Sequence, residues 1–259
     1  MLKIILLTIF FVIIDGCKYK LSTYTAETPE QKLNEVHLSR IKEAETATGA
    51  TFKIALISDT HNYYKELEKL IDVINSRGPY TFVIVSGDVT NLGLLEEYEK
   101  ARDFLNKLKY PYLVAVGNHD LIANGDEIFP RMFGASDFKF TFKNIDFIFF
   151  DNNNWENSGA TPDRAWIERQ LLQSAAAEKI LIAHVHPADR DRFTDQQIAD
   201  FETMLNNFEV SYIINGHNHN PGEGVFGNAS QITVGSPNKG SYFELLVTPG
   251  GITHQKIDF

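Results

Sequence analysis

Side chains that can bind metal ions follow five short apolar runs of this sequence, each at the point where the run ends. Carboxylate and amide oxygens and imidazole nitrogens are ligands for divalent cations. Six of the eight histidines lie at or beside these positions. The five groups are Asp59 with His61, Gly87 with Asp88, Gly117-Asn118-His119-Asp120, His184, and Gly216-His217 with His219.

Each group taken alone has an ordinary explanation. Asp59-Thr60-His61 is typical of a helix cap beside an incidental histidine, and Gly87-Asp88 is a common turn. His217-Asn218-His219 is more suggestive, because alternate residues at a strand end point the same way. The coincidence would have to occur five times along the chain. In α/β sheets, ligands bind at the carboxyl ends of the strands, so the groups are predicted to converge on one crevice.

The apolar runs themselves predict the elements that position these groups. They are short, rich in Val, Ile and Phe, and separated by amphipathic segments, which is typical of a layered α/β fold. The predicted buried strands span residues 52–57, 81–85, 112–116, 179–183 and 212–214. Two predicted helices lie between the first three strands, and two more are opened by Thr161-Pro162 and by a capping box of Thr194 with Gln197.

Two hairpins accompany these strands. Residues 138–142 and 145–150 flank Lys143-Asn144, and residues 242–247 and 252–257 flank Pro249-Gly250-Gly251. Antiparallel hairpins appended to a βαβ series predict two mixed sheets packed together with helices outside, and not a single doubly wound sheet.

The ordered set Asp-x-His, Gly-Asp, Gly-Asn-His-Asp, a lone His and Gly-His-x-His resembles the calcineurin-like metallophosphoesterase family. The resemblance implies a four-layer α/β/β/α sandwich with two metal ions between its sheets. It implies a first metal held by Asp59, His61, Asp88 and His219. It implies a second metal held by Asp88, Asn118, His184 and His217, with the two ionised oxygens of Asp88 bridging both ions. His119 would be the catalytic histidine outside the ligand set, and Asp120 the acid that orients it.

Such a pair of ions explains the chemistry. Two cations about 3.5–4 Å apart lower the pKa of a bridging water, clamp phosphoryl oxygens and neutralise the charge that develops in an in-line displacement. The resemblance therefore implies hydrolysis of a phosphodiester or phosphomonoester by a metal-bridging hydroxide, with His119 as general acid. Nitrogen and oxygen ligands without thiolate fit divalent or trivalent Mn, Fe, Zn or Ni. The net charge of −10 would repel a phosphate ester unless such cations lie in the site.

Two positions leave the pattern open. His184 and His186 are two histidines on the same face of one strand end. The family's usual His-x-Pro or His-His-Pro ending favours His184 as the ligand, with His186 supporting it or facing substrate. Asn91 stands where many relatives have an acid or a tyrosine, so this chain lacks a carboxylate that would help to hold the adjacent loop or a ligand histidine.

Other polar and aromatic residues are weaker candidates. The Asn-rich segment 151–154 follows a predicted strand and either rims the site or forms a plain turn. Trp166 fits the core of its helix better than a base-stacking role. Lysines and arginines form no stripe, which argues against duplex nucleic acid as the main partner. The sequence indicates no oligomeric state.

The first residues form a processing segment. The apolar run 4–14 is too short to span a bilayer as a helix but fits the core of a signal peptide. Ile14-Asp15-Gly16-Cys17 resembles a bacterial lipobox, from which Asp15 departs. Cys17, the only cysteine, is therefore predicted to be lipidated after removal of residues 1–16 and to anchor an exported protein to a membrane. An N-terminal anchor helix with an incidental cysteine is the alternative.

The remainder divides into two parts. Residues 17–50 are polar and predicted to be a lipidated tether with one helix, opened by Thr28-Pro29. Residues 51–259 show no repeat or low-complexity tract and are predicted to be one phosphoesterase domain.

Three functions are compatible with these features: a hydrolase of small phosphate esters, a metal-stabilised binding module on the same fold, and a nuclease-like protein acting on DNA ends. A pure scaffold has no chemical reason to keep His119, and a nuclease-like protein should show a basic groove or an added domain. The sequence therefore favours the hydrolase. The short loops between the motifs predict a small or accessible ester.

Overall fold

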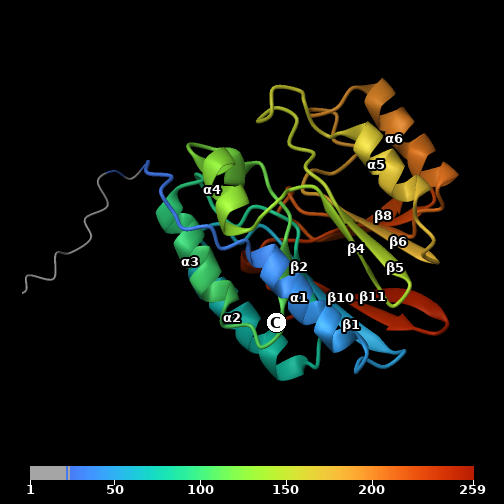
Figure 1. The fold of residues 1–259 in the computed structure, drawn as a ribbon, viewed down its shortest axis with the longest axis horizontal. Helices are drawn as coiled ribbons and strands as arrows, with labels where there is room; N and C mark the ends of the chain where they lie inside the picture. Colours follow the sequence, from blue (N-terminus) through green and yellow to red (C-terminus); the bar gives the residue numbers. More distant parts are fainter. Residues whose placement is uncertain (1–21, 23) are drawn as a thin grey trace, which may run out of the picture.

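The computed structural model describes residue 22 and residues 24–259. Two mixed β-sheets pack face to face, and helices cover the outer face of each sheet (Figure 1). The protein thus has the predicted four-layer α/β/β/α architecture. Cys17 and the predicted signal segment lie outside the described residues. No helix in the described ranges combines the length and apolar character needed to cross a membrane.

The first sheet has five strands in the order β11-β10-β1-β2-β3. Strands β1, β2 and β3 run parallel to one another. The C-terminal hairpin of β10 and β11 joins them, with β10 antiparallel to β1. The strands are β1 (Phe52–Ile57), β2 (Phe82–Val85), β3 (Tyr112–Val114), β10 (Ser241–Thr248) and β11 (Gly251–Asp258). Parallel pairing places the carboxyl ends of β1, β2 and β3 at one end of the sheet.

The second sheet has six strands in the order β4-β5-β6-β7-β9-β8. The strands are β4 (Phe138–Phe142), β5 (Ile145–Phe149), β6 (Glu178–Ile182), β7 (Tyr212–Asn215), β8 (Gly222–Phe226) and β9 (Ala229–Thr233). Strands β5, β6, β7 and β9 are parallel, and the predicted β4–β5 hairpin turns at Lys143 and Asn144, both with positive φ. Sequence patterns did not predict β8 and β9. The Gly-Glu-Gly start of β8 lacks apolar alternation.

Alternating side chains of the strands supply both layers of the core. On β1, Ile54 and Leu56 pack between the sheets, whereas Ala55 and Ile57 pack under the helices. Between the sheets, the Phe82 ring of the first lies 5.3 Å from the Phe147 ring of the second, in an edge-to-face arrangement. Aromatic packing of this kind fixes how the two sheets face each other.

Helices α2 (Tyr64–Arg77), α3 (Leu95–Leu105) and α4 (Gly125–Met132) belong to the layer of the first sheet. Helices α5 (Arg164–Leu172) and α6 (Asp195–Asn207) cover the second, on the opposite side of the molecule (Figure 1). The capping box of Thr194 and Gln197 opens α6 as predicted. Helix α5 is capped by Asp163, which accepts a hydrogen bond from the Trp166 N–H, and not by Thr161. Helix α4 was not predicted, because Pro130 lies inside it.

Helix α1 (Leu33–Glu45) begins at Leu33, whereas the sequence pattern predicts a start at Pro29. The N–H groups of Gln31 and Lys32 donate to the Arg131 carbonyl, which holds this stretch outside a helix. The helix packs against β3: the Asn34 amide donates to the Val114 carbonyl at 2.9 Å and accepts from the Val114 N–H at 2.8 Å. This part of the segment predicted as a tether is therefore packed onto the folded body.

Candidate metal centre

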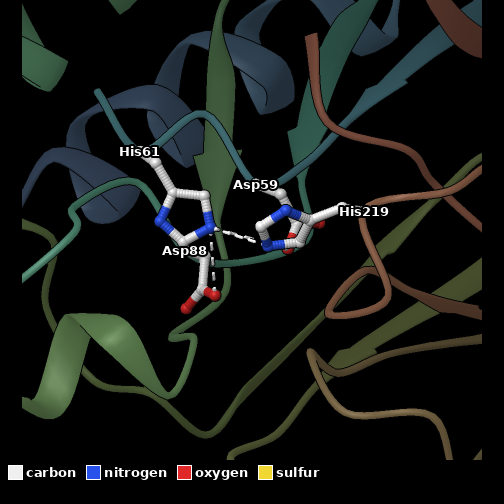
Figure 2. A group of neighbouring side chains, drawn as sticks. All are labelled: Asp59, His61, Asp88 and His219. Carbon is white, nitrogen blue, oxygen red and sulfur yellow. Dashed lines mark hydrogen bonds and ion pairs between the residues drawn. The ribbon is translucent and has the colours of Figure 1, made fainter. Parts of the chain in front are cut away.

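The five groups of ligand-type residues meet where the strands of both sheets end. Asp59 and His61 follow β1, Asp88 follows β2, and His219 lies beyond β7 of the other sheet. These four side chains point toward one another (Figure 2), and each offers a ligand atom within 4.8 Å of the others. Three of them are buried and His219 is half-buried.

The spacing within this first group fits a shared cation. The Nε2 atom of His61 lies 3.1 Å from Nε2 of His219 and 3.5 Å from Oδ2 of Asp88. Oδ1 of Asp59 lies 3.6 Å from Nε2 of His219. The Nδ1 atom of His61 is 2.9 Å from the Thr90 carbonyl oxygen and donates to it, so the lone pair is on Nε2. Nε2 of His61 can therefore accept a hydrogen bond from Nε2 of His219, and both nitrogens can bind one cation when each presents its lone pair.

A second group meets the first at Asp88. Oδ1 of Asn118 lies 3.1 Å from Nε2 of His184 and 2.9 Å from Nδ1 of His217. Nε2 of His184 is also 3.1 Å from Oδ2 of Asp88, and its Nδ1 is 2.8 Å from the Ser86 carbonyl oxygen, to which it donates. All seven ligand residues implied by the family resemblance therefore fall into two adjoining groups that share Asp88.

The shared carboxylate gives a test of fit. Within the described part of the chain, the buried Oδ2 of Asp88 has no hydrogen-bond partner of proper geometry. It faces Nε2 of His61 and Nε2 of His184, one from each group. Its Oδ1 accepts from the His119 N–H at 2.9 Å. A buried anionic oxygen without a donor is costly unless a cation binds it, so the donor set fits a metal at this position.

His186 lies outside both groups. Its Nδ1 accepts a hydrogen bond from the Ala188 N–H at 3.0 Å, and its ring lies 6.5 Å from that of Phe226. The geometry therefore favours His184 over His186 as the ligand.

The candidate ligand residues have an unusual backbone. Positive φ angles between 39° and 70° occur at five of them, none of which is glycine: Asp59, His61, Asp88, His217 and His219. L-residues rarely adopt this left-handed conformation, which costs about 1–3 kcal/mol where it is strained. Backbone bonds between loops hold it, including Asp59 N–H to the Gly87 carbonyl and His61 N–H to the Asp88 carbonyl, each 3.0 Å.

Two glycines of the motifs are required by close approach. A Cβ on Gly117 would lie 2.2 Å from Oδ1 of Asp88, and one on Gly216 would lie 2.0 Å from the Ser58 hydroxyl and 2.4 Å from Oδ2 of Asp59. Both contacts are too short for any side chain. The glycines of Gly-Asn-His-Asp and Gly-His-x-His therefore let the backbone reach the carboxylates.

The electrostatics of the centre suit metal ligation. Burial lowers the pKa of His61 and of His217 to about 4 each, so both rings are neutral near pH 7, which is the form that binds metals. Burial opposes the charged form of Asp88 as well, but the neighbouring His184 ring outweighs it and holds the pKa of Asp88 below the usual range. Burial raises the pKa of Asp59 to about 7. A cation beside these carboxylates would favour their ionised forms.

His119 borders the first group without belonging to it. It lies half-buried on the short 3₁₀ turn η1 (His119–Leu121), with its ring 4.8 Å from the His61 ring. Its Nδ1 donates to the Asn91 carbonyl at 2.7 Å, which fixes the ring and assigns the second proton position to Nε2.

The role predicted for Asp120 requires a correction. Its carboxylate accepts from the Thr90 N–H, the Thr90 hydroxyl and the Gly117 N–H, each at 2.9 Å, and not from His119. On a 3₁₀ turn, neighbouring side chains point in different directions, so adjacency in sequence did not predict contact. Asp120 instead ties the loop after β2 to the loop after β3. It acts on His119 only indirectly, since the first of these loops carries the Asn91 carbonyl.

Glu97, which sequence reasoning missed, supplies the carboxylate that Asn91 lacks. Its Oε2 accepts from the N–H groups of Asn91, Leu92 and Leu94, at 3.3, 2.8 and 3.4 Å. It lies in the first turn of α3, where an acid also favours the helix dipole. A first-turn glutamate shortly after the Gly-Asp motif is the signal that could have identified it.

The Asn-rich segment 151–154 after β5 holds two strand-end segments in place through hydrogen bonds. Asn152 donates to the Val185 carbonyl at 2.8 Å and accepts from the Val185 N–H at 3.0 Å, directly beside His184. Asn153 donates to the Val116 carbonyl at 3.1 Å, just before Gly117. Trp166 is partly buried against the core under α5 and α6, as its helical position predicted.

Known proteins resemble this chain in sequence and in fold. The chain is 24% identical over 188 residues to a probable cyclic nucleotide phosphodiesterase of Coxiella burnetii, covering 65% of this chain and 76% of the relative. Its fold resembles GAP50, the anchor in the inner membrane complex of Plasmodium, with a TM-score of 0.64, 15% identity and coverage of 81% and 85%.

A dimetal phosphatase from Danio rerio has the same fold, with a TM-score of 0.60, 13% identity and coverage of 80% of this chain and 99% of that one. The family model for calcineurin-like phosphoesterases matches residues 52–221, which run from β1 to just beyond His219. With its sheets, its strand-end ligands and this match, the chain belongs to the calcineurin-like phosphoesterase family.

Proposed function

We propose that this protein hydrolyses phosphodiesters with two metal ions held by the two adjoining groups of the candidate metal centre. The observation that carries the proposal is the buried Oδ2 of Asp88, which lacks a donor and faces one ligand histidine of each group. Asp59, His61 and His219 complete the first site, and Asn118, His184 and His217 the second. Mn, Fe, Zn and Ni all fit this nitrogen and oxygen donor set.

Bound metal ions would supply an activated water and neutralise phosphoryl charge. The remaining work falls to His119. Because the Asn91 carbonyl accepts from its Nδ1, Nε2 is the atom from which a protonated ring can donate to the departing ester oxygen. The hydrogen bonds of Glu97 and Asp120 hold the loops that carry this carbonyl and ring.

The proposed preference for diesters rests on the relative from Coxiella burnetii, which is named as a probable cyclic nucleotide phosphodiesterase. The fold alone does not decide between catalysis and binding, since a phosphatase and an anchor protein both share it. A binding module gains nothing from a histidine fixed at the border of the ligand group. His119 therefore favours hydrolysis over the alternative of a metal-stabilised binding module.

The test uses His119→Ala with a series of diesters whose leaving groups differ in pKa, in protein reconstituted with each candidate metal. p-Nitrophenolate leaves unassisted and an alkoxide does not, so the variant should lose about 10²–10⁴-fold in kcat on alkyl esters and far less on p-nitrophenyl esters. Metal content should stay at two ions. His254→Ala, on β11, is the matched histidine control.

Equal losses on both classes of ester, with both metals retained, would leave His119 as an electrostatic residue and not an acid. Failure of the parent protein to hydrolyse any ester with any of the four metals would overturn the hydrolase proposal and leave the binding module.

A further inference from the structure

Two loops of the second sheet border the metal centre beside His217. One is the segment between β5 and α5, and the other the segment between β6 and α6. The second loop brings Oδ2 of Asp189 to 3.7 Å from Nε2 of His217. A tight turn follows, in which the N–H groups of Arg192 and Phe193 donate to the Asp189 carbonyl, at 3.2 and 2.8 Å. Arg192 is thus held close to a proposed metal ligand.

Trp155 lies on the first loop, directly against Arg192. The guanidinium carbon of Arg192 lies 4.3 Å from the centre of the Trp155 ring, a cation–π contact. Nη1 of Arg192 is 2.8 and 3.0 Å from the two carboxylate oxygens of Glu156, and the Arg192 side chain is only 8% exposed. The contact is therefore fixed, and one face of the indole is covered.

The rest of the indole is open. Trp155 is 60% exposed, which is unusual for a side chain of this size held by a buried partner. The base of its loop is rigid, since Asn152 and Asn153 bond to the strand-end segments that carry His184 and Gly117. The ring is thus a fixed aromatic surface on the loop that packs against Arg192.

We infer that Trp155 is a stacking platform for a planar aromatic group of the substrate, such as the base of a nucleotide whose phosphodiester binds at the metal centre. The inference rests on the proposed function. The carboxylate of Glu156 neutralises the charge of Arg192, so this ion pair attracts a second phosphate only weakly. The free face of the indole, by contrast, can stack on a planar aromatic ring. A cation on the covered face holds the ring in one orientation for an incoming base.

The first experiment measures kcat and KM of Trp155→Ala and Trp155→Phe on 3′,5′-cyclic AMP and on glycerophosphoethanolamine, a diester without an aromatic group. Trp155→Ala should raise KM for cyclic AMP by about 5- to 150-fold, as expected for the loss of one stacked base, with a far smaller change for the alkyl diester. Trp155→Phe should retain most of the affinity. Leu172→Ala, 75% exposed on α5, is the matched surface control.

A second readout does not need turnover. The chain has two tryptophans, Trp155 and Trp166, so a Trp166→Phe background isolates the fluorescence of Trp155. AMP should quench this fluorescence saturably, also in the His119→Ala variant. Absence of quenching, or equal changes in KM for both diesters, would overturn the platform. If the parent protein hydrolyses no phosphate ester with any of the four metals, the proposed function fails by itself, while AMP quenching still tests Trp155.

Discussion

Asp88 is the residue on which both proposed metal sites depend. It is the one carboxylate shared by the two groups, and its backbone also accepts the His61 N–H that orients the loop after β1. Asn91 lies three residues further on and contributes to the centre through its backbone carbonyl. The two residues therefore make a matched pair for testing the ligand scheme.

Asp88→Ala should lower the metal content toward one ion or none and reduce kcat by several orders of magnitude, because both ions lose a ligand. Asn91→Ala should keep nearly two ions, since alanine retains the carbonyl. Elemental analysis of purified, reconstituted protein measures both. Two tightly bound metals in Asp88→Ala would show that the ligand scheme is wrong.

For single residues of the candidate site, the residue type at each strand end was the main basis for prediction from the sequence. Carboxylate, amide and imidazole groups at strand ends are recognisable, and the structure brings together those assigned by resemblance. The partner of His119 was not predictable, because it is the backbone carbonyl of Asn91, which any residue would provide. For the same reason, the bonds of Asp120 to Thr90 and Gly117 leave no trace in sequence spacing.

Among the elements, α3 has a function beyond packing. Its first-turn residue Glu97 holds three N–H groups of the loop after β2, and this loop carries the carbonyl that orients His119. The start of a helix thus sets the position of the proposed acid.

Glu97→Ala should lower kcat on alkyl diesters about tenfold while both metals stay bound, because the His119 ring loses its fixed orientation. Stability should fall by about 1–2 kcal/mol from the loss of the loop hydrogen bonds. Glu96→Ala, which removes a surface ion pair with Lys100 at 2.9 Å, should change neither quantity appreciably. A drop in metal content in Glu97→Ala would instead place its effect on the ligands.

Elements with strong periodicity were predictable and elements with mixed composition were not. The apolar runs of β1 and β2 and the Lys143-Asn144 hairpin have the predicted positions within a residue or so. Strand β8 and helix α4 were missed, because glycines and Pro130 mask their patterns. Strand β9 was missed as well, since its pairing with β7 is a tertiary contact that local propensity does not specify. The start of α1 was also set by a tertiary contact, from Gln31 to Arg131.

For the molecule as a whole, His37 links stability to pH. It is buried on α1, with its ring 4.0 Å from the ring of Tyr112 on β3. Burial, together with the charge of Arg40, lowers the pKa of His37 to about 4. In the unfolded chain the pKa returns to about 6.5. Between these values the unfolded chain binds more protons, so stability falls as the pH falls from 6.5 to 4 and levels off below.

His37→Gln should therefore flatten the pH dependence of stability. The parent protein should lose up to about 3 kcal/mol through this group between pH 7 and pH 4, at about 1.36 kcal/mol per pKa unit, and the variant should not. Denaturant unfolding of the metal-loaded protein at several pH values measures the difference. Parallel curves for the two proteins would exclude His37 as the source.

We propose, from Gly16-Cys17 behind the apolar run, that the protein is exported and anchored to a membrane by a lipid on Cys17. Cys17→Ser should abolish lipid labelling and release the mature form from the membrane fraction, because the anchor requires the thiol. Fractionation with metabolic lipid labelling tests this. Unchanged membrane partitioning of the variant, with the signal removed, would count against a lipid tether.

The contact between Asn34 and Val114 has a consequence for solubility. Strand β3 is the last strand of its sheet, and beyond it no strand pairs with its free side among residues 24–259. There the Asn34 amide occupies the N–H and C=O of Val114, and α1 covers the strand. A chain shortened to start at Thr51 would expose these groups to the strands of other molecules. We therefore expect α1, which lies outside the predicted domain boundary, to protect the fold from edge-to-edge aggregation.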